Sequence, residues 1–515
     1  MKYLYGLAVI ASLILWSSCR NDFDYVDSTG NLEFSKDTVF LDTVFTNIGS
    51  STYNLKVYNN SDEDINIPTV RLAQGENSFY RLNVDGVPGK NFEDVQVLAN
   101  DSIFIFIETT VDVATQTNDS QFLYTDQILF DSGGNEQRVE LVTLIQDAVF
   151  LFPADLGNGI FETLTLGQGE DAVEIEGFFL DDDELTFTNQ KPYVIYGYAA
   201  VPSNKTLTVQ PGARIHFHAS SGLLVANQGT IKAIGAPSSD PEALENEIIF
   251  EGDRLEPDFA DVPGQWGTIW LTAGSTDHEF SYTTIKNGIA GILMDSNDGD
   301  RTLTLRNVQI YNSSNVGLLA QTGDVYGENV VISNSGQSSL ACSLGGRYTF
   351  NHCTFGNYWD NSFRQFPAVT IDNVLDTGEQ LLVFDLEEAN FNNCIIYGSE
   401  QREVLFTKNN QGAFNFKFSN TLFRFEDPQG EFVGLSSYDF GNPELYENCV
   451  RNQDPIFQDP ETNNLNIEEG TSAAEGIGDP EISAQVPIDL NGTNRSATAP
   501  DAGAYEATVF PDPEG

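Results

Sequence analysis

The sequence predicts an all-β protein built from more than one structural unit. Its 515 residues exceed what one compact core usually organises. Glycine is abundant, with 44 residues, while methionine is scarce, with 2, and this composition favours strands and turns over long helices. Two strand patterns follow one another along the chain. The first alternates in the manner of a β-sandwich, and the second repeats at intervals typical of stacked coils.

The first 19 residues are predicted to be a signal peptide. Lys2 supplies a positive start, and residues 4–16 form an apolar run that is too short to span a bilayer. Two serines then precede Cys19, an arrangement that resembles the lipobox of bacterial lipoproteins. The resemblance implies that Cys19 carries the lipid. Trp16 departs from the aliphatic residue usual there, so ordinary secretion with an incidental Cys19 is the alternative.

Residues 20–30 are predicted to be a polar, acidic tether. This segment resembles the leaders of surface-exposed lipoproteins of the Bacteroidetes group, which implies attachment to the outer membrane by an N-terminal lipid and exposure at the cell surface. The periplasmic face stays open as the alternative location. Beyond the signal peptide, no apolar run reaches the length of a membrane span.

Residues 31–150 alternate apolar and polar side chains between turns rich in asparagine, aspartate and glycine, which predicts a β-sandwich. The runs LKVYNNSDEDINI, NSFYRLNV and LANDSIFIFIETTV occur in this order. They resemble the immunoglobulin-like modules of the ASPM/SPD-2/Hydin group. The resemblance implies an immunoglobulin-like sandwich with a spacer or adhesion role.

The second half of the chain contains an internal repeat. Six short segments share one frame, beginning with YTTIKN at 282–287 and NVQIYN at 307–312. The first four aligned apolar residues are spaced by 25, 22 and 23 positions, and the next step is 41, which predicts an extra coil or a loop around 360–390. The aligned apolar positions are Ile285, Ile310, Ile332, Phe355, Ile396 and Phe423.

The repeat predicts files of like side chains, because strand residues two positions apart share a face. Cys353 and Cys394 fall in one interior file, either as stacked buried thiols or as a disulfide between adjacent coils. An asparagine follows each of the first four aligned positions by two residues, and stacked amides can hydrogen-bond from coil to coil. The predicted asparagine ladder consists of Asn287, Asn312, Asn334 and Asn357.

These coils and the asparagine column resemble right-handed parallel β-helices of the pectate-lyase-like superfamily. The resemblance implies a single-stranded right-handed parallel β-helix over residues 155–450. Residues 451–515 contain DPIF, SAA and PDAGAYE, which resemble the closing segments of bacterial β-helix proteins. A stack of coils needs its open end covered, so this segment is predicted to be the C-terminal cap.

The formal net charge of −52 limits the partners. Such a field repels the phosphates of nucleic acids, which are therefore not expected as partners, and attracts Ca²⁺, the one ion that the composition suggests. The cysteines and the four histidines lack the spacing of a structural zinc site. The acidic clusters are interpreted as solvated loops.

Catalytic motifs of known β-helix enzymes are missing from the sequence. Gly-His-Gly of polygalacturonases and Arg-x-Pro-x-x-Arg of pectate lyases do not occur. The first candidate ligand-binding group is Arg214, His216 and His218, which alternate on one strand face, although plain solvent-facing positions also explain them. The second candidate group, at the start of the irregular stretch, is Tyr358, Trp359, Asp360 and Arg364.

Two functional hypotheses follow. The first is a non-catalytic surface protein that binds a polysaccharide or serves as an accessory or adhesion subunit beside another outer-membrane protein. The second is a polysaccharide lyase or glycoside hydrolase acting on an acidic polysaccharide, with catalytic residues that the sequence does not reveal. A groove lined by aromatic and amide side chains favours the first hypothesis. Acidic and cationic side chains clustered beside a groove favour the second.

Overall fold

The computed structural model describes residues 25–46, 48–111, 121–131, 133–167, 172–240, 243–295 and 301–511. The predicted signal peptide and Cys19 lie outside these residues. The chain is all-β and divides into two compact units, residues 1–147 and 148–515. Each unit is described by itself.

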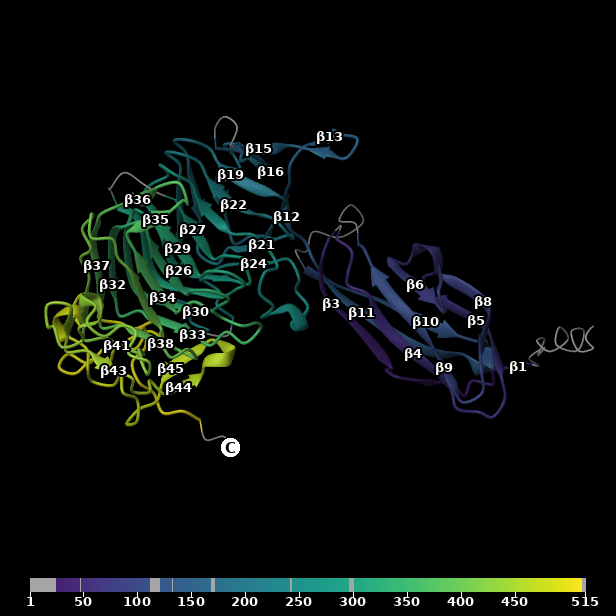
Figure 1. The fold of residues 1–515 in the computed structure, drawn as a ribbon. Coiled ribbons are helices and arrows are strands. Elements are labelled where there is room, and N and C mark those ends of the chain that lie inside the picture. The colour runs from purple at the N-terminus through teal and green to yellow at the C-terminus, as the bar shows by residue number, and fades with distance from the viewer. Residues whose placement is uncertain are drawn as a thin grey trace, which may run out of the picture. The chain divides into compact units, whose positions relative to one another are not determined.

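The first unit contains two sheets that share one hydrophobic core (Figure 1). One sheet is mixed, because β1 pairs with β5 and β11 with β3 in parallel while its other pairs are antiparallel. The other sheet is antiparallel throughout. The mixed sheet consists of β1 (Val26–Asp27), β5 (Ile65–Leu72), β10 (Gln121–Phe130), β11 (Gln137–Gln146), β3 (Thr38–Phe45) and β8 (Asn91–Val97). The antiparallel sheet consists of β2 (Glu33–Phe34), β4 (Tyr53–Asn59), β9 (Asp101–Thr109), β6 (Tyr80–Val84) and β7 (Val87–Gly89).

The start of the first unit lies earlier in the chain than the sequence predicts. Val26 and Asp27, placed in the tether by their polar surroundings, pair with Ile65 and Asn66. The hydroxyl of Ser28 donates a hydrogen bond to the carboxylate of Asp131 at 2.7 Å. The short strand is hard to recognise from the sequence because only two residues pair.

The second unit passes back and forth between two long sheets whose strands lie side by side in Figure 1. Within these two sheets all strand pairs are parallel except the first pair of the smaller sheet, β15 with β16. The larger sheet consists of β12 (Val149–Leu151), β17 (Thr186–Phe187), β18 (Tyr193–Ile195), β20 (Thr206–Val209), β21 (Arg214–Phe217), β23 (Thr230–Ile234), β24 (Ile248–Gly252), β26 (His278–Lys286), β28 (Arg301–Ser313), β30 (Asp324–Ser335), β32 (Gly346–Asn351), β33 (Thr354–Asn357), β37 (Leu386–Asn392), β38 (Ile395–Gly398), β40 (Lys417–Ser419), β41 (Leu422–Phe423), β42 (Tyr446–Glu447) and β43 (Val450–Arg451).

The smaller parallel sheet contains ten strands, and the chain enters it once in each pass. Its strands are β15 (Thr163–Leu166), β16 (Val173–Phe179), β19 (Tyr198–Val201), β22 (Gly222–Val225), β25 (Ile269–Leu271), β27 (Ile292–Met294), β29 (Leu318–Gln321), β31 (Leu340–Ser343), β34 (Val369–Asp372) and β39 (Val404–Thr407). Short hairpins and one short helix complete the unit: β13 (Asp155–Gly157) with β14 (Ile160–Phe161), β35 (Val374–Asp376) with β36 (Leu381–Val383), β44 (Phe457–Asp459) with β45 (Asn464–Ile467), and α2 (Pro480–Ser483).

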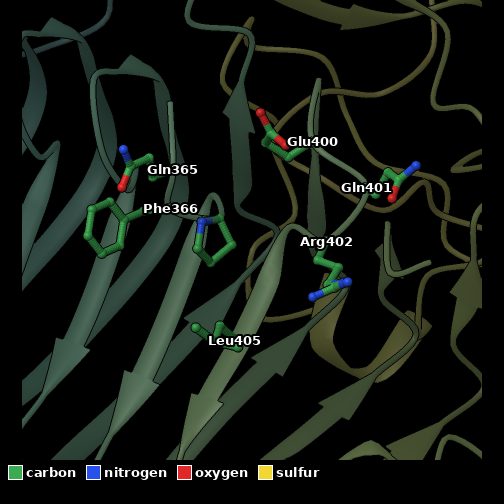
Figure 2. Close-up of a pocket in the computed structure, with 7 residues that line it drawn as sticks. Gln365, Phe366, Glu400, Gln401, Arg402 and Leu405 are labelled. Carbon is green, nitrogen blue, oxygen red and sulfur yellow. The ribbon is translucent and has the colours of Figure 1, made fainter. Parts of the chain in front are cut away.

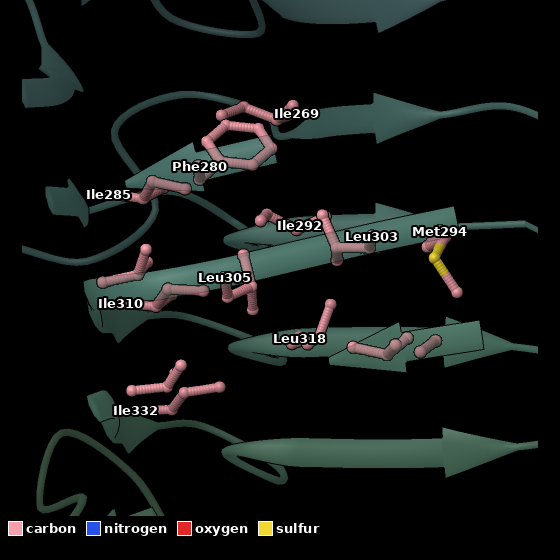
Figure 3. Close-up of a cluster of buried hydrophobic side chains, with 14 of the residues drawn as sticks. Ile269, Phe280, Ile285, Ile292, Met294, Leu303, Leu305, Ile310, Leu318 and Ile332 are labelled. Carbon is pink, nitrogen blue, oxygen red and sulfur yellow. The ribbon is translucent and has the colours of Figure 1, made fainter. Parts of the chain in front are cut away.

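The apolar residues of the repeat form one continuous file in the larger sheet. Ile285, Ile310 and Ile332 are direct strand partners, and all three are fully buried. Figure 3 shows these side chains stacked between the two sheets with Ile269, Ile292 and Leu318 from the smaller sheet. The predicted register of the repeat is confirmed.

The long step in the repeat is one lengthened pass, not an additional coil. Phe355 and Ile396 pair directly, although 41 positions separate them. The intervening residues contain β34, which joins the smaller sheet, and the hairpin of β35 and β36. The pairing of the strands alone keeps successive passes in register, so the connection between two paired strands can be longer without disturbing the sheet.

A second file marks the bend in each pass through the larger sheet. Six residues, each three positions before an aligned apolar residue, have backbone φ between 46° and 55°, and so does Asn448, three positions before Arg451, the strand partner of Phe423. Asparagine tolerates this left-handed conformation better than most residues, and its amide can bond to its neighbour in the stack. Asn329 Nδ2 donates to Asn307 Oδ1 at 2.9 Å. The file is Tyr282, Asn307, Asn329, His352, Asn393, Asn420 and Asn448.

The asparagines of the predicted ladder are all buried but, among the described residues, do not bond to one another. Asn312 Nδ2 donates to Asp261 Oδ1 at 3.3 Å, and Asn334 Nδ2 donates to Asn463 Oδ1 at 2.8 Å. Asn287 and Asn357 donate to backbone carbonyls. Asn287, Asn312 and Asn334 thus hold covering segments against the sheet, whereas Asn357 bonds to the backbone of Ser335 in the adjacent pass. The amide-to-amide bond between passes lies on the neighbouring file instead.

The thiols of Cys353 and Cys394 are free, and both side chains are buried. Burial raises the pKa of Cys353 well above its ordinary value, and the adjacent Cys394 adds to the effect. Of the two alternatives that the sequence left open, the structure contains stacked thiols.

The end of the stack is covered by residues 426–446 and not by the segment predicted to be the cap. Phe432, Tyr438 and Phe440 pack against the last residues of the core. The rings of Phe425 and Tyr438 have centroids 4.9 Å apart. The predicted cap, from residue 451 onward, instead runs along the flank of the larger sheet.

Contacts along this flank fasten the C-terminal segment to several passes of the chain. The backbone N–H of Ala504 donates to Thr354 Oγ1 at 3.0 Å, and that of Gly503 donates to the carbonyl of Asn393 at 2.8 Å. Asn420 Nδ2 donates to the carbonyl of Ile477 at 2.7 Å. The segment that contains the predicted closing motifs therefore packs beside the larger sheet.

Replacing Ile310 by alanine tests the buried file. The Ile310→Ala variant is expected to lose about 2–5 kcal/mol in the free energy of unfolding, because the cavity lies inside a continuous core. The matched control is Gln309→Ala, which changes an outward-facing neighbour and is expected to stay within about 0.5 kcal/mol. Urea denaturation measures both, and equal losses would contradict the assigned facing of the two side chains.

Candidate functional site

A groove of about 730 Å³ lies on the outer face of the larger sheet. Its floor comes from β26 and β28 near the bend of each pass. Pro237, Ser238, Leu244 and Glu247 line one wall, and residues 462–464, 466 and 488–492 of the C-terminal segment line the other. The groove is thus assembled from parts of the chain that are far apart in the sequence.

Amides and tyrosines dominate the lining of this groove. Two tyrosines belong to the floor, and Tyr505 comes from the C-terminal segment. Amide side chains offer both hydrogen-bond donors and acceptors, while tyrosine offers a ring face and a hydroxyl. The amide and tyrosine residues of the lining are Asn307, Gln309, Asn463, Asn464, Asn466, Asn491, Tyr282, Tyr311 and Tyr505.

The tyrosines hold their protons at neutral pH. Burial raises the pKa of Tyr311, with Lys286 lowering it and nearby carboxylates raising it further. Burial likewise raises the pKa of Tyr505 and of Tyr282, with the charge of Glu247 adding to both. All three hydroxyls are therefore neutral groups that can donate a hydrogen bond.

Three carboxylates line the groove, and they differ in their partners. Asp489 accepts hydrogen bonds from the backbone N–H groups of Thr493 and Glu506, so it organises the wall. Asp261 accepts one from the Asn312 amide. The carboxylate of Glu247 accepts none from the described residues. Burial raises the pKa of Glu247, partly opposed by the charge of Arg214.

A partly buried charge network lies close to Tyr311. Lys286 Nζ lies 3.0 Å from Glu251 Oε2, and His216 Nδ1 lies 3.7 Å from Glu251 Oε1. Burial lowers the pKa of Lys286, but the charges of Glu251 and Tyr311 outweigh this effect and raise it overall. Burial lowers the pKa of His216. The ammonium of Lys286 is therefore charged and neutralised within the protein.

The first sequence-predicted group lies on one strand face, but its members contact the protein. Arg214 donates to the carbonyls of Glu247 at 2.6 Å and Leu244 at 2.7 Å. His216 is buried, and the ring of His218 stacks on Tyr196 with centroids 4.4 Å apart. His218 Nδ1 also lies 2.8 Å from Asp253. None of the three lines the groove.

The second predicted group is mostly buried, which corrects the expectation that it faces a ligand. The ring of Tyr358 packs edge-on against Phe457 at 6.1 Å, and Trp359 donates its indole N–H to Ser362. Only Asp360 is exposed. The polar residues around these aromatics resembled a loop leaving the sheet, but the C-terminal segment covers that place.

Arg364 forms a buried ion pair. Its Nη2 lies 2.6 Å from Glu403 Oε1, and its side chain is 1% exposed while that of Glu403 is 0% exposed. Burial raises the pKa of Glu403, and the bonds from Arg364 oppose this shift. The pair anchors the long connection after β33, so Arg364 serves the structure and not a ligand.

A smaller pocket of about 260 Å³ lies beside this ion pair. Figure 2 shows Gln365 and Phe366 on one loop, with Glu400, Gln401 and Arg402 on another. Arg402 is engaged with Glu431 at 2.9 Å. The pocket has about a third of the volume of the groove and a less aromatic lining, so the groove is the better candidate site.

Sequence reasoning missed most of the groove. Tyr282 and Tyr311 flank aligned apolar positions, so alternation places them on the outer face, and this signal was readable. Glu247 belongs to a loop, and Tyr505 belongs to a closing motif that was interpreted as an end cap. The return of the C-terminal segment along the sheet leaves no periodic signal.

Two further findings concern metal sites and membrane-spanning helices. Among the described residues, no group of three or more histidine, cysteine, aspartate and glutamate side chains is arranged to hold a metal ion. Within the same residues, no helix has both the length and the apolar character needed to cross a membrane.

Comparisons with known proteins yield only distant likenesses. No protein-family model matches the chain, and no curated protein matches it. A family 123 glycoside hydrolase from Clostridium perfringens is 9% identical with a TM-score of 0.17, covering 23% of this chain and 28% of that one. The periplasmic chaperone SfaE is 13% identical with a TM-score of 0.16, covering 23% and 58%.

The catalytic domain of a family 87 α-1,3-glucanase gives a longer but equally distant match. It is 10% identical with a TM-score of 0.18 and covers 72% of this chain and 86% of that one. The chain spans less than two thirds of the length of the first two structures. At these scores the three likenesses carry no argument about function.

The wall of the groove depends on a buried ion pair that can be tested. Arg495 Nη1 lies 3.1 Å from Glu506 Oε1, and its Nη2 donates to Asn329 Oδ1 at 2.7 Å. The Arg495→Met variant is expected to lose about 3–5 kcal/mol of stability, because Glu506 is left with an unpaired charge. Hydrogen exchange is expected to accelerate in residues 457–506.

The matched control for this variant is Lys417→Met, which breaks an ion pair at the surface of the same unit. Exposed pairs contribute at most about 1 kcal/mol, so this variant is expected to leave exchange in the C-terminal segment unchanged. Similar behaviour of the two variants would show that Arg495 does not fasten the wall.

Proposed function

We propose that the chain is a lipid-anchored surface protein that binds a glycan in the groove of its second unit. One observation carries the proposal: three neutral tyrosines and a row of amides line a groove of about 730 Å³. Sugar rings present apolar C–H faces that pack on aromatic rings, and their hydroxyls bond to amides and carboxylates. The groove matches both needs.

The architecture that we propose agrees with this role. We assign residues 31–150 to an immunoglobulin-like sandwich that serves as a spacer, and residues 155–450 to a right-handed parallel β-helix. The parallel pairing and the in-register apolar file support the second assignment. The flanking wall of the groove comes from the C-terminal segment, through residues 462–464, 466, 488–492 and Tyr505.

We also propose attachment to the outer membrane through Cys19, with exposure at the cell surface, and docking beside an outer-membrane protein partner as an accessory subunit. The signal-like N-terminus with its single early cysteine supports the anchor. A spacer between the lipid and the groove suits a protein that captures polymer away from the membrane.

A second candidate function is hydrolysis of the bound glycan. It is favoured by Glu247 and Asp261, two carboxyl groups that line the same groove. Glycoside hydrolysis uses such a pair, one acting as an acid and the other as a base or nucleophile. Burial raises the pKa of Glu247, which suits the acid role.

Replacing Tyr311 tests the binding site. On a panel of immobilised polysaccharides, the Tyr311→Ala variant is expected to bind at least about tenfold more weakly, because the ring face is lost. The control is Tyr326→Ala, which removes a tyrosine of the same sheet outside the groove. Retained binding by Tyr311→Ala would contradict the assigned site.

The same panel separates binding from cleavage. New reducing ends released by the wild type, but not by Glu247→Gln, would establish the second function in place of pure binding. Binding without release of reducing ends supports the first.

The anchor is tested by cell fractionation. The Cys19→Ala variant is expected to move from the membrane fraction to the soluble fraction when the cells are washed with high salt to release protein partners, because the lipid is the only proposed attachment to the bilayer itself. Cys449→Ala serves as the control, since it alters a cysteine far from the signal peptide. Membrane association of Cys19→Ala would refute the lipid anchor.

A further inference from the structure

The titratable groups that line the groove share one sign of charge. Glu247, Asp261 and Asp489 contribute carboxylates, and no lysine, arginine or histidine is among the lining residues. The formal net charge of the chain, −52, adds a long-range field of the same sign. A ligand in the groove therefore meets negative charge from Glu247 on one wall, from Asp489 on the other and from Asp261.

The basic groups nearest to this lining are already engaged within the protein. Lys286 pairs with Glu251 at 3.0 Å, and Arg495 pairs with Glu506 at 3.1 Å. Arg214 donates to the carbonyls of Glu247 and Leu244. Releasing any of these cations toward a ligand would leave a buried carboxylate or carbonyl without its partner, which is costly.

Among the three carboxylates, Glu247 has the strongest influence on which ligands the groove accepts. It is only partly exposed and has no hydrogen-bond donor among the described residues, while three tyrosines lie around it. Its two oxygens can accept hydrogen bonds from a pair of sugar hydroxyls. A uronate carboxylate at the same place would meet a like charge in a poorly solvated site, which raises the free energy of the complex.

We infer that the groove takes an uncharged glycan and rejects uronate-containing polysaccharides. This inference deepens the proposed function and rests on it. It also opposes the acidic polysaccharide that the sequence suggested as a substrate for an enzyme. The tyrosines and amides provide affinity for any sugar chain, and the carboxylates restrict the choice to chains without negative charge.

A glycan array with neutral hexose polymers, polyuronates and chitosan tests the inference on the full-length protein. We expect at least one neutral polymer to bind, with affinity nearly independent of salt. Polyuronates are expected to bind at least about tenfold more weakly at low salt, where repulsion is least screened. Chitosan, a cationic glycan, is expected to bind no more tightly than an unrelated polycation, and its binding is expected to weaken as salt is added.

A charge-neutral variant makes the test specific to the groove. The isosteric pair Glu247→Gln and Asp261→Asn is expected to raise the ratio of polyuronate affinity to neutral-polymer affinity at least about tenfold, because the charge is removed while the side-chain shape is kept. Asp277→Asn is the control, because Asp277 is an exposed carboxylate that pairs with Lys232 outside the groove. Thermal unfolding of each variant verifies that the fold is retained.

The outcomes separate the two proposals. Wild-type preference for a polyuronate, lost in Tyr311→Ala, would overturn the charge inference and leave glycan binding in place. Preference for chitosan that vanishes in the charge-neutral variant would also overturn it. Failure of every glycan on the array to bind would refute glycan binding itself, and this inference with it.

Discussion

The second unit depends on parallel pairing in register between successive passes of the chain. Each pass buries too little apolar surface to be stable alone, and burial becomes complete only when the next pass lies on it. Ile285, Ile310 and Ile332 show the arrangement, because each is the direct partner of the next and none is exposed. A shift by one residue would turn the whole file toward solvent, so the apolar pattern fixes the register.

The left-handed residues at the bend add a second constraint. A pass through the larger sheet changes direction at one residue with positive φ, and the same position repeats at Asn307, Asn329 and Asn393. The amide of Asn329 bonds to that of Asn307, so the residue that tolerates the bend also links adjacent passes. The bend directs the following outward side chains, including Gln309 and Tyr311, toward the groove.

Periodicity made part of this structure predictable from the sequence. The apolar file and the shared interior file of Cys353 and Cys394 follow from alternation and from the repeat, whereas the free state of the two thiols came only from the structure. The sequence predicts bonds between amides in the file of Asn312 and Asn334, whereas the observed amide-to-amide bond joins Asn307 and Asn329 in the neighbouring file. Both files contain asparagine, and the sequence does not show which amides meet. Their actual partners, such as Asp261 and Asn463, come from segments with no repeat.

The groove itself was not predictable, since its walls come from irregular segments. Trp359 and Arg364 resembled surface residues because polar residues surround them, yet contacts distant in the sequence bury both. Arg364 pairs with Glu403 across a connection whose course no local pattern specifies. Tyr505 reaches the groove only because the chain returns along the sheet instead of across its end.

This return has a consequence for how the protein matures. During synthesis the sheet that forms the floor leaves the ribosome before residues 488–505, so the binding groove stays open on one side until the final stretch is made. A chain that ends before residue 488 lacks Tyr505 and the ion pair of Arg495, so it has the floor of the groove without most of this wall.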